Sequence, residues 1–282
     1  MANVLIFGES AYIARSFAGY AKGAHNITAV SSRGAAWAGL PFARFDSVLY
    51  CAGAAHLPPG KAADRLYFEV NCDLAAAVAA KAKAEGVRQF VYLSSAAVFG
   101  RAAEIGPASP LKPEGPYGAS KLKAEAALAA LRGGGFAVCV VRPPMVYGRG
   151  CKGNFARLTR LALAAPLFPD IENRRSMIYI ENLCHFLSGL VRSGEAGVFF
   201  PQNKDYVNTT ELVRQIRRCR GKNTAVTRLF NPLITSLSKR IPELEKLFGD
   251  MVYHGEAREY VDYVGFEESV RRSVTIPTLG EK

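Results

Sequence analysis

The chain has 282 residues, of which 49% are hydrophobic and 21% are charged, a composition typical of a globular protein and not of a disordered one. This length allows one large α/β domain, or a main domain with a smaller lobe. The net charge of +12 could favour nucleic acid, but the basic residues are dispersed and no aromatic-basic signature accompanies them, so we expect no nucleic-acid partner.

No apolar run approaches the length of a membrane span, and the first residues lack a cleavable signal, so we expect no membrane span and a cytoplasmic location. The charge leaves association with an anionic membrane surface open. The six cysteines form no CxxC pair, which favours reduced core residues over a disulfide framework. The four histidines show no metal-ligand spacing, so we expect no metal site.

The first half of the chain alternates short apolar runs with helical stretches, which is the pattern of βαβ units. The runs predict strands at Val4–Phe7, Ile27–Val30, Ser47–Cys51, Gln89–Leu93 and Ala137–Val141. Helices are predicted over Tyr12–Lys22, Asp73–Glu85 and Gly118–Arg132. Because the strands are apolar throughout, we predict an α/β fold with a Rossmann-type doubly wound parallel sheet, which binds ligands at the carboxyl ends of its strands.

The alternation of short apolar runs and helical stretches ends after Arg142-Pro-Pro144, and the predicted loops become longer. We therefore predict a dinucleotide-binding domain over residues 1–144 and a smaller C-terminal substrate-binding lobe over residues 145–282, partly interleaved with the first. Within the lobe, the capping-box-like Asn208-x-x-Glu211 predicts a helix over Thr210–Arg220.

The first predicted strand runs directly into Gly8-Glu-Ser-Ala11-Tyr-Ile-Ala14 and then a helix. This is the position of a dinucleotide fingerprint, in which glycines let the backbone approach a pyrophosphate at a helix N-terminus. Here only Gly8 remains, with alanines at the other glycine positions. Taken alone, the segment fits a plain β-turn-α connection equally well. In this βαβ context we predict cofactor contacts at Gly8, Ala11, Tyr12 and Ile13.

The second predicted strand ends in Val30-Ser-Ser-Arg33, without an acid to hold a ribose 2′-hydroxyl. Hydroxyls and a guanidinium suit a 2′-phosphate, so Ser31 and Arg33 favour NADP(H) over NAD. The alternative is that Arg33 is an ordinary solvated arginine.

Tyr117-Gly-Ala-Ser-Lys121 follows Ser95, which closes an apolar strand, by 22 residues. Residues four apart lie on one face of a helix, so Tyr117 and Lys121 should point the same way. A lysine ammonium favours the phenolate of a nearby tyrosine, and a serine hydroxyl can hold the same substrate oxygen. The three could move a proton on a sugar or alcohol hydroxyl while a cofactor takes hydride. In isolation, the pentad could also be the start of a surface helix.

Further motifs accompany these residues along the chain. They are Cys51-Ala-Gly-Ala-Ala-His56, Val70-Asn71-Cys-Asp-Leu74, Leu93-Ser-Ser-Ala-Ala-Val-Phe-Gly100, Arg142-Pro-Pro-Met-Val-Tyr-Gly148, Gly153-Asn-Phe155 and Arg174-Arg-Ser-Met-Ile-Tyr179. Together the motifs resemble the extended short-chain dehydrogenase/reductase family in its NAD-dependent nucleotide-sugar epimerase/dehydratase branch, from Gly8 to about Asn208. The last three look like the UDP-glucose 4-epimerase-like subgroup, which includes UDP-4-keto-sugar reductases.

The resemblance implies catalytic roles for three residues. Tyr117 would be the acid/base, and Lys121 would bind the nicotinamide ribose and lower the pKa of the tyrosine. Ser95 would bridge to the sugar hydroxyl, with Ser94 as a structural neighbour.

The resemblance also implies binding roles. Ala52 and Gly53 would line the cofactor, and Pro143 and Pro144 would border the nicotinamide. Asn71 matches an asparagine near the nucleotide site, although it could equally cap the following helix.

For the substrate, the resemblance implies that Asn154 and Arg175 contact the pyrophosphate of a nucleotide sugar, while Arg174 is solvated. It also implies a homodimer formed by two alanine-rich helices, Asp73–Glu85 and Gly118–Arg132.

One departure from the family lies between Val30-Ser-Ser-Arg33 and Ser47, where only the 13 residues 34–46 replace its usual helix and strand. The adenine pocket should be trimmed, with Trp37 or Phe42 as partial replacements.

The function implied is a nucleotide-sugar 4-epimerase of the UDP-hexose class with a retained NAD. The alternatives are an NADPH-dependent UDP-4-keto-sugar reductase and a non-catalytic nucleotide-sensing relative.

Overall fold

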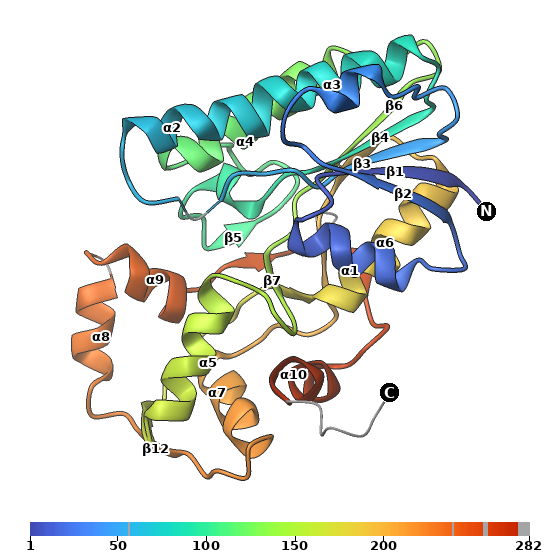
Figure 1. Ribbon diagram of the computed structural model, residues 1–282. Helices are drawn as coiled ribbons and strands as arrows, with labels where there is room; N and C mark the ends of the chain where they lie inside the picture. The colour runs from blue at the N-terminus through green and yellow to red at the C-terminus, as the bar shows by residue number, and fades with distance from the viewer. Residues whose placement is uncertain (56, 239, 256–258, 276–282) are drawn as a thin grey trace.

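The computed structural model describes residues 1–55, 57–238, 240–255 and 259–275, and its centre is a six-stranded parallel sheet (Figure 1). The strands lie in the order β10-β6-β4-β3-β1-β2. Their bounds are Asn3–Phe7 (β1), Asn26–Val30 (β2), Ser47–Tyr50 (β3), Gln89–Leu93 (β4), Ala137–Val141 (β6) and Gly197–Phe199 (β10). The doubly wound α/β fold and its five predicted strands are confirmed. His56, which ends one of the motifs, lies outside the described residues.

Helices cover both faces of the sheet, which explains why its strands are apolar throughout. On one face lie α1 (Tyr12–Tyr20) and α6 (Ile180–Ser193). On the other lie α2 (Lys61–Phe68), α3 (Leu74–Ala84) and α4 (Gly115–Ala129). Strand β1 shows the alternation: Val4 and Ile6 pack into the α1/α6 core, whereas Leu5 and Phe7 pack into the α3/α4 core.

The predicted helix Asp73–Glu85 begins much earlier than expected. Helix α2 continues through a π-helical turn, Glu69–Asp73, directly into α3. No glycine or proline occurs from residue 61 to residue 85, so nothing in the sequence ends the helix within this stretch. Asn71 therefore lies inside a helix, and its alternative role as an N-cap is wrong.

The second lobe contains α5 (Asn154–Ala164), α7 (Thr209–Arg218), α8 (Asn231–Ser238), α9 (Pro242–Phe248) and α10 (Phe266–Val274). The predicted start of α7 is confirmed, because the side chain of Asn208 accepts a hydrogen bond from the backbone N–H of Glu211 at 3.0 Å.

Short parallel strand pairs connect the parts of this lobe. They are β7 (Met145–Tyr147) with β9 (Met177–Tyr179), β8 (Leu167–Pro169) with β12 (Ala225–Thr227), β11 (Pro201–Asn203) with β14 (Glu259–Val261), and β13 (Val252–Tyr253) with β5 (Glu104–Ile105).

The two predicted parts of the chain exchange elements in both directions. Residues beyond 144 return to the main sheet as α6 and β10, while β5 from the first part pairs with β13 in the lobe. The lobe is thereby attached to the sheet by several crossings of the chain.

Within the described ranges, no helix is long and apolar enough to cross a bilayer, and no group of three or more His, Cys, Asp or Glu residues could hold a metal ion. The six cysteines are free; four are buried and two are partly buried.

Candidate active site

The turn after β1 brings its backbone against the end of β3. Gly8 has φ +98°, and a Cβ atom there would stand 2.6 Å from the backbone nitrogen of Ala52. The backbone N–H groups of Gly8 and Glu9 both donate to the carbonyl of Val30, at 2.9 and 3.0 Å. Only glycine fits this position, so the one glycine retained from the fingerprint is the one that the sheet geometry demands.

The start of α1 is open to an anion. Ala11 occupies the N-cap position without a side-chain hydrogen bond to the first turn, so the first amides of the helix are available to a phosphate. Tyr12 and Ile13 follow in that turn and are half-buried. The hydroxyl of Tyr12 points into the protein, since a Cβ on Gly148 would stand 2.6 Å from it. Tyr12 therefore also joins this turn to the loop after β7.

The end of β2 is exposed, with Ser31 and Arg33 both at the surface. The hydroxyl of Ser31 accepts a hydrogen bond from the backbone N–H of Arg33 at 3.1 Å. This turn thus presents an exposed hydroxyl and an exposed arginine at the edge of the sheet, two groups that suit a phosphate.

The segment between β2 and β3 is short, as the sequence predicted, and contains only one 3-10 helix, Ala36–Gly39. Phe42 is fully buried beneath the ammonium of Lys81, so the expectation that its ring could face an adenine is wrong. Trp37 remains partly exposed, with its ring edge-on to Phe7 at 5.6 Å.

Asn71 fixes the loop after β3 to helix α4. Its amide nitrogen donates to the carbonyl of Ala54 at 3.1 Å and to the hydroxyl of Ser120 at 3.0 Å, while its oxygen accepts from the N–H of Ala54 at 2.9 Å. Ser120 in turn donates to the carbonyl of Tyr117 at 2.8 Å. The serine within the Tyr-Gly-Ala-Ser-Lys pentad thus positions the tyrosine that precedes it.

Gly53 lies between Asn71 and Lys121. A Cβ on Gly53 would stand 3.5 Å from the Asn71 oxygen and 3.6 Å from the Lys121 nitrogen. Gly53 is exposed and Ala52 is buried beside it, so this loop offers a narrow surface next to the lysine.

Ser95 and Tyr117 come together because α4 approaches the 3-10 helix Ala96–Phe99 closely. A Cβ on Gly118 would stand 2.6 Å from the carbonyl oxygen of Ala97, so this approach requires glycine. Ser95 caps the 3-10 helix by accepting from the N–H of Ala97 at 3.2 Å. Burial raises the pKa of Tyr117, and hydrogen bonding with the Ser95 side chain opposes this rise.

Lys121 is buried on the same helix, one turn after Tyr117. Its nitrogen donates to the carbonyl of Leu93 at 2.8 Å and lies 4.8 Å from the centre of the Tyr92 ring. Burial lowers its pKa from 10.5 to about 8. Burial raises the pKa of Tyr117 in the structure, and the lysine nitrogen contacts Leu93 and Tyr92, so the lowering of the tyrosine pKa by Lys121 stays a prediction.

A buried ion pair lies beneath these groups. The two guanidinium donors of Arg142 contact the carboxylate of Glu125 at 3.1 and 2.5 Å. The hydroxyl of Ser94 also donates to Glu125, which confirms Ser94 as a structural neighbour. Pro143 and Pro144 follow Arg142 and are buried, and the carbonyl of Pro143 accepts from the N–H of Ala96. The pair thus holds together the ends of β4 and β6 and helix α4.

The two residues predicted to bind a substrate pyrophosphate lie in the second lobe. Asn154 is the exposed first residue of α5. Arg175 is buried and donates to the carbonyl of Gly249 at 2.5 Å, and burial lowers its pKa. The Nε of Arg175 is buried without a partner in the described part of the chain, so it could still bind an acceptor. Arg174, by contrast, is exposed.

Sequence reasoning missed Tyr67, whose ring contacts that of Tyr117 edge-on at 5.8 Å. Its hydroxyl accepts a hydrogen bond from the N–H of Leu57. The uninterrupted helical stretch from residue 61 could have revealed it, because Tyr67 lies on the helix that was overlooked.

The residues present fit a nicotinamide dinucleotide. The glycine turn, the open start of α1 and the buried lysine lie along the carboxyl ends of β1, β3 and β4, where the doubly wound sheet binds nucleotides. Between β2 and β3, where the adenine end would lie, the connection is a short segment with one 3-10 helix, Ala36–Gly39.

Comparisons with known proteins identify the family and the fold. Residues 5–200 match the NAD dependent epimerase/dehydratase family. A UDP-glucose 4-epimerase from Vibrio cholerae is 34% identical over 199 residues, which are 66% of this chain. The match spans 60% of the length of that relative.

Two solved structures illustrate the shared fold. The Bordetella bronchiseptica enzyme WbmH, in complex with NAD+, gives a TM-score of 0.74 at 17% identity and covers 97% of both chains. A dTDP-4-dehydrorhamnose reductase from Bacillus anthracis str. Ames, in complex with NADP, gives 0.65 at 18% identity, over 80% of this chain and 83% of that one. At these identities the likeness establishes the fold alone.

Proposed function

The chain belongs to the NAD dependent epimerase/dehydratase family, and from this premise we propose that it is a nucleotide-sugar 4-epimerase acting on UDP-hexoses. The observation that carries the proposal is the placement of Ser95, Tyr117 and Lys121 together at the carboxyl end of the sheet. A non-catalytic nucleotide sensor would need none of these three side chains.

In this proposal, Tyr117 takes the proton of the sugar 4-hydroxyl and later returns it. A nicotinamide cofactor supplies the hydride acceptor and donor when bound. Ser95 holds the same sugar oxygen, because the close approach of Gly118 to Ala97 brings the start of α4 beside the end of β4. Lys121 binds the nicotinamide ribose. Its nitrogen is positioned for this by its contacts with Leu93 and Tyr92 and lies beside Gly53.

The cofactor-binding residues of the proposal are Gly8, Ala11, Tyr12 and Ile13 at the pyrophosphate, with Ala52, Gly53 and Asn71 beside the nicotinamide ribose. Pro143 and Pro144 border the nicotinamide. At the substrate, Asn154 and Arg175 contact the pyrophosphate of the nucleotide sugar, because the buried Arg175 keeps one donor unused.

A 4-keto-sugar reductase is the second candidate, and the exposed end of β2 favours it. Ser31 and Arg33 offer a hydroxyl and a guanidinium to a 2′-phosphate, which fits NADP(H). A reductase must exchange its cofactor at each turnover, and the short segment over the adenine end would permit that exchange.

One experiment separates the two candidates. The purified protein is denatured and the released nucleotide is identified, while the native protein is incubated with UDP-hexoses and the sugar C4 configuration is followed by NMR. Stoichiometric NAD with formation of the C4 epimer supports the epimerase. No bound nucleotide, and reduction of a UDP-4-keto-sugar by NADPH, would replace that proposal with the reductase.

We also propose a homodimer in which α3 and α4 pack against their two-fold mates as a four-helix bundle. Both helices have exposed alanines, which are Ala77 and Ala80 in α3 and Ala126 and Ala129 in α4. Small side chains allow close helix approach. Light scattering should give about twice the 30.5 kDa chain mass at micromolar concentration. Ala127→Arg should yield a monomer, and a wild-type monomer would contradict the proposal.

A further inference from the structure

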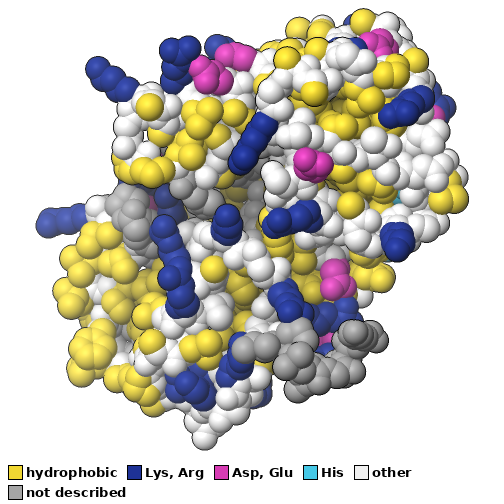
Figure 2. Space-filling view, in the orientation of Figure 1, with side chains coloured by type: hydrophobic (Ala, Val, Ile, Leu, Met, Phe, Trp, Pro, Cys, Tyr) yellow, Lys and Arg dark blue, Asp and Glu magenta, His cyan; other side chains and the backbone are white. Residues whose placement is uncertain are grey.

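Helix α8 and its flanks form an exposed apolar surface on the second lobe. The helix carries no charged residue, and none of its residues is buried. Exposed fractions are 78% for Leu229, 47% for Phe230, 59% for Leu233 and 38% for Ile241, and we call these four residues the apolar tip. Figure 2 shows hydrophobic side chains gathered at the lower left, where Figure 1 places α8.

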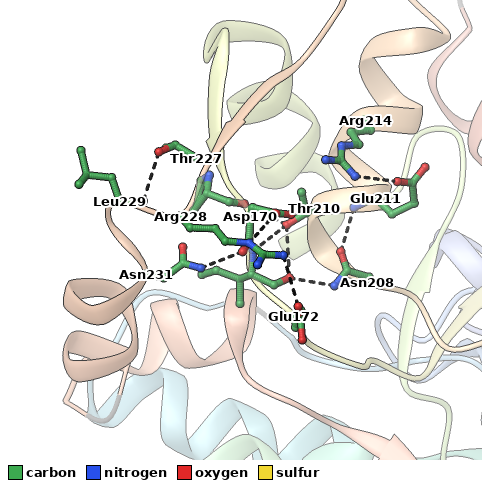
Figure 3. Close-up of polar contacts among 12 residues, drawn as sticks. Asp170, Glu172, Asn208, Thr210, Glu211, Arg214, Thr227, Arg228, Leu229 and Asn231 are labelled. Atoms are coloured by element: carbon green, nitrogen blue, oxygen red, sulfur yellow. Dashed lines mark hydrogen bonds and ion pairs between the residues drawn. The ribbon is translucent and has the colours of Figure 1, made fainter.

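The base of the tip is fixed by polar contacts, so the apolar side chains face outward from an anchored segment. Asn231 donates to the carbonyl of Asp170 at 2.8 Å, and Arg228 pairs with the Asp170 carboxylate at 3.0 Å. The backbone N–H of Leu229 donates to Thr227 at 3.2 Å, while its side chain points away from this network (Figure 3). Clusters of exposed large apolar residues usually mark an interaction surface.

The surroundings of the tip are strongly basic. Residues 217–246 contain eight Lys and Arg and two Glu; of the eight, Arg217 is buried and Arg228 is paired with Asp170 and Glu172. Arg240 and Lys246 lie immediately beside the tip, are exposed, and form no ion pair with a described carboxylate. The tip therefore combines outward-facing leucines with two exposed basic side chains, Arg240 and Lys246, that have no ion-pair partner among the described carboxylates.

The apolar and basic side chains of this surface together favour one kind of partner. A second copy of the chain would bring one basic surface against another, which costs free energy by charge repulsion. A nucleic acid would use the arginines but would leave the leucines in water. An anionic lipid surface accepts both, since apolar side chains enter the acyl boundary while basic side chains contact the headgroups. We propose that the apolar tip docks on an anionic phospholipid surface.

The tip is connected to the candidate active site. Helix α9 packs against α8, and Gly249, which follows α9, accepts the hydrogen bond from Arg175. Arg101 pairs with Glu245 of α9 at 3.4 Å and with Glu114, the N-cap of α4, at 2.8 Å. The tip is thus linked through α9 to Arg175 and to the start of the helix that carries Tyr117 and Lys121.

The test is co-sedimentation of the full chain with vesicles of phosphatidylcholine alone or mixed with phosphatidylglycerol. The wild-type protein should pellet with the anionic vesicles and much less with the neutral ones. Each basic residue near the surface contributes about fivefold in affinity, so Arg240→Gln with Lys246→Gln should weaken binding by roughly 25-fold. High salt should also weaken binding, because it screens the charges.

The apolar part is tested with Leu229→Asp combined with Leu233→Asp, which should weaken binding at least tenfold, as expected for two leucines that no longer enter the acyl boundary. The matched control is Leu66→Asp, since Leu66 is 40% exposed on α2 in the main domain and should leave binding unchanged. Thermal unfolding confirms that each variant is folded.

Three results would overturn the proposal. The first is equal pelleting of the wild-type protein with neutral and anionic vesicles, and the second is equal pelleting of the Leu229→Asp/Leu233→Asp variant and the wild-type protein. The third is a concentration-dependent increase in mass that this variant abolishes, without any vesicle binding, which would assign the tip to a second copy.

Discussion

Replacing Lys121 with methionine should stabilise the protein while abolishing turnover. Lys121 is 4% exposed, and burial lowers its pKa from 10.5 to about 8. One pH unit corresponds to about 1.4 kcal/mol, so keeping the ammonium charged in the folded protein at pH 7 costs about 3 kcal/mol. Methionine has a similar length and no charge, so it removes this cost.

Part of the gain is offset by contacts that the lysine makes. Its nitrogen donates to the carbonyl of Leu93, which would be left without this donor, at a cost of about 1 to 2 kcal/mol. The net stabilisation of Lys121→Met should therefore be about 1 to 2 kcal/mol at neutral pH.

The pH dependence gives the sharper test. The folded-state pKa of Lys121 lies below that of the unfolded chain, so between about pH 8 and 10.5 the unfolded state binds more protons. Wild-type stability must therefore rise with pH relative to the variant, and the advantage of the variant should disappear across this window. Other groups that titrate there are common to both proteins and cancel in the difference.

The assay is urea unfolding of both proteins at pH 7, 9 and 10. Lys123→Met is the matched control, because Lys123 is exposed on the same helix and its replacement should give no pH-dependent gain. A Lys121→Met protein that is less stable than wild type at pH 7, or a difference that is equal at pH 7 and pH 10, would refute the reasoning.

Four further changes probe the site. Tyr117→Phe should lower turnover by at least about 100-fold with substrate binding retained, and a near-wild-type rate would remove the tyrosine from catalysis. Glu125→Gln should lower the free energy of unfolding by about 3–5 kcal/mol in urea titrations, because Arg142 stays buried without its partner; an unchanged midpoint contradicts this. Arg33→Ala should weaken NADP(H) binding more than NAD(H) binding in calorimetry, and an equal loss argues against a 2′-phosphate contact. Arg175→Ala should weaken binding of UDP and of a UDP-sugar by a similar factor, and a loss confined to the sugar places it elsewhere.

The sheet could be predicted from sequence because each of its strands is a short run of apolar residues buried on both faces. In a βαβ context, the runs at Val4–Phe7 and Gln89–Leu93 predict buried parallel strands, and both are strands in the structure. The paired strands of the lobe could not be predicted, because two or three residues show no periodicity. Helix α2 is not evident from local signals, because Asn71 is of a residue type that favours helix caps, yet here it lies in the π-helical turn that joins α2 to α3.

The catalytic helix was predictable because Tyr117 and Lys121 are one turn apart, and local spacing sets which face they share. Their electrostatics were not predictable in the same way. Burial decides the pKa of both groups, and burial depends on the packing of Gly118 against Ala97 and of Lys121 against Tyr92, which are distant in the chain.

Glu125 connects the stability of the fold to the chemistry of the site. After the dominant effect of burial, which lowers the pKa of Lys121, the negative charge of Glu125 is among the influences that raise it. Glu125 lies one turn beyond Lys121 and is itself neutralised by Arg142 at the end of β6. The ion pair therefore holds α4 against the sheet, and the negative charge of Glu125 also raises the pKa of Lys121. Removing Glu125 should consequently weaken the fold and lower the pKa of Lys121 further, so the two residues should not behave additively when both are changed.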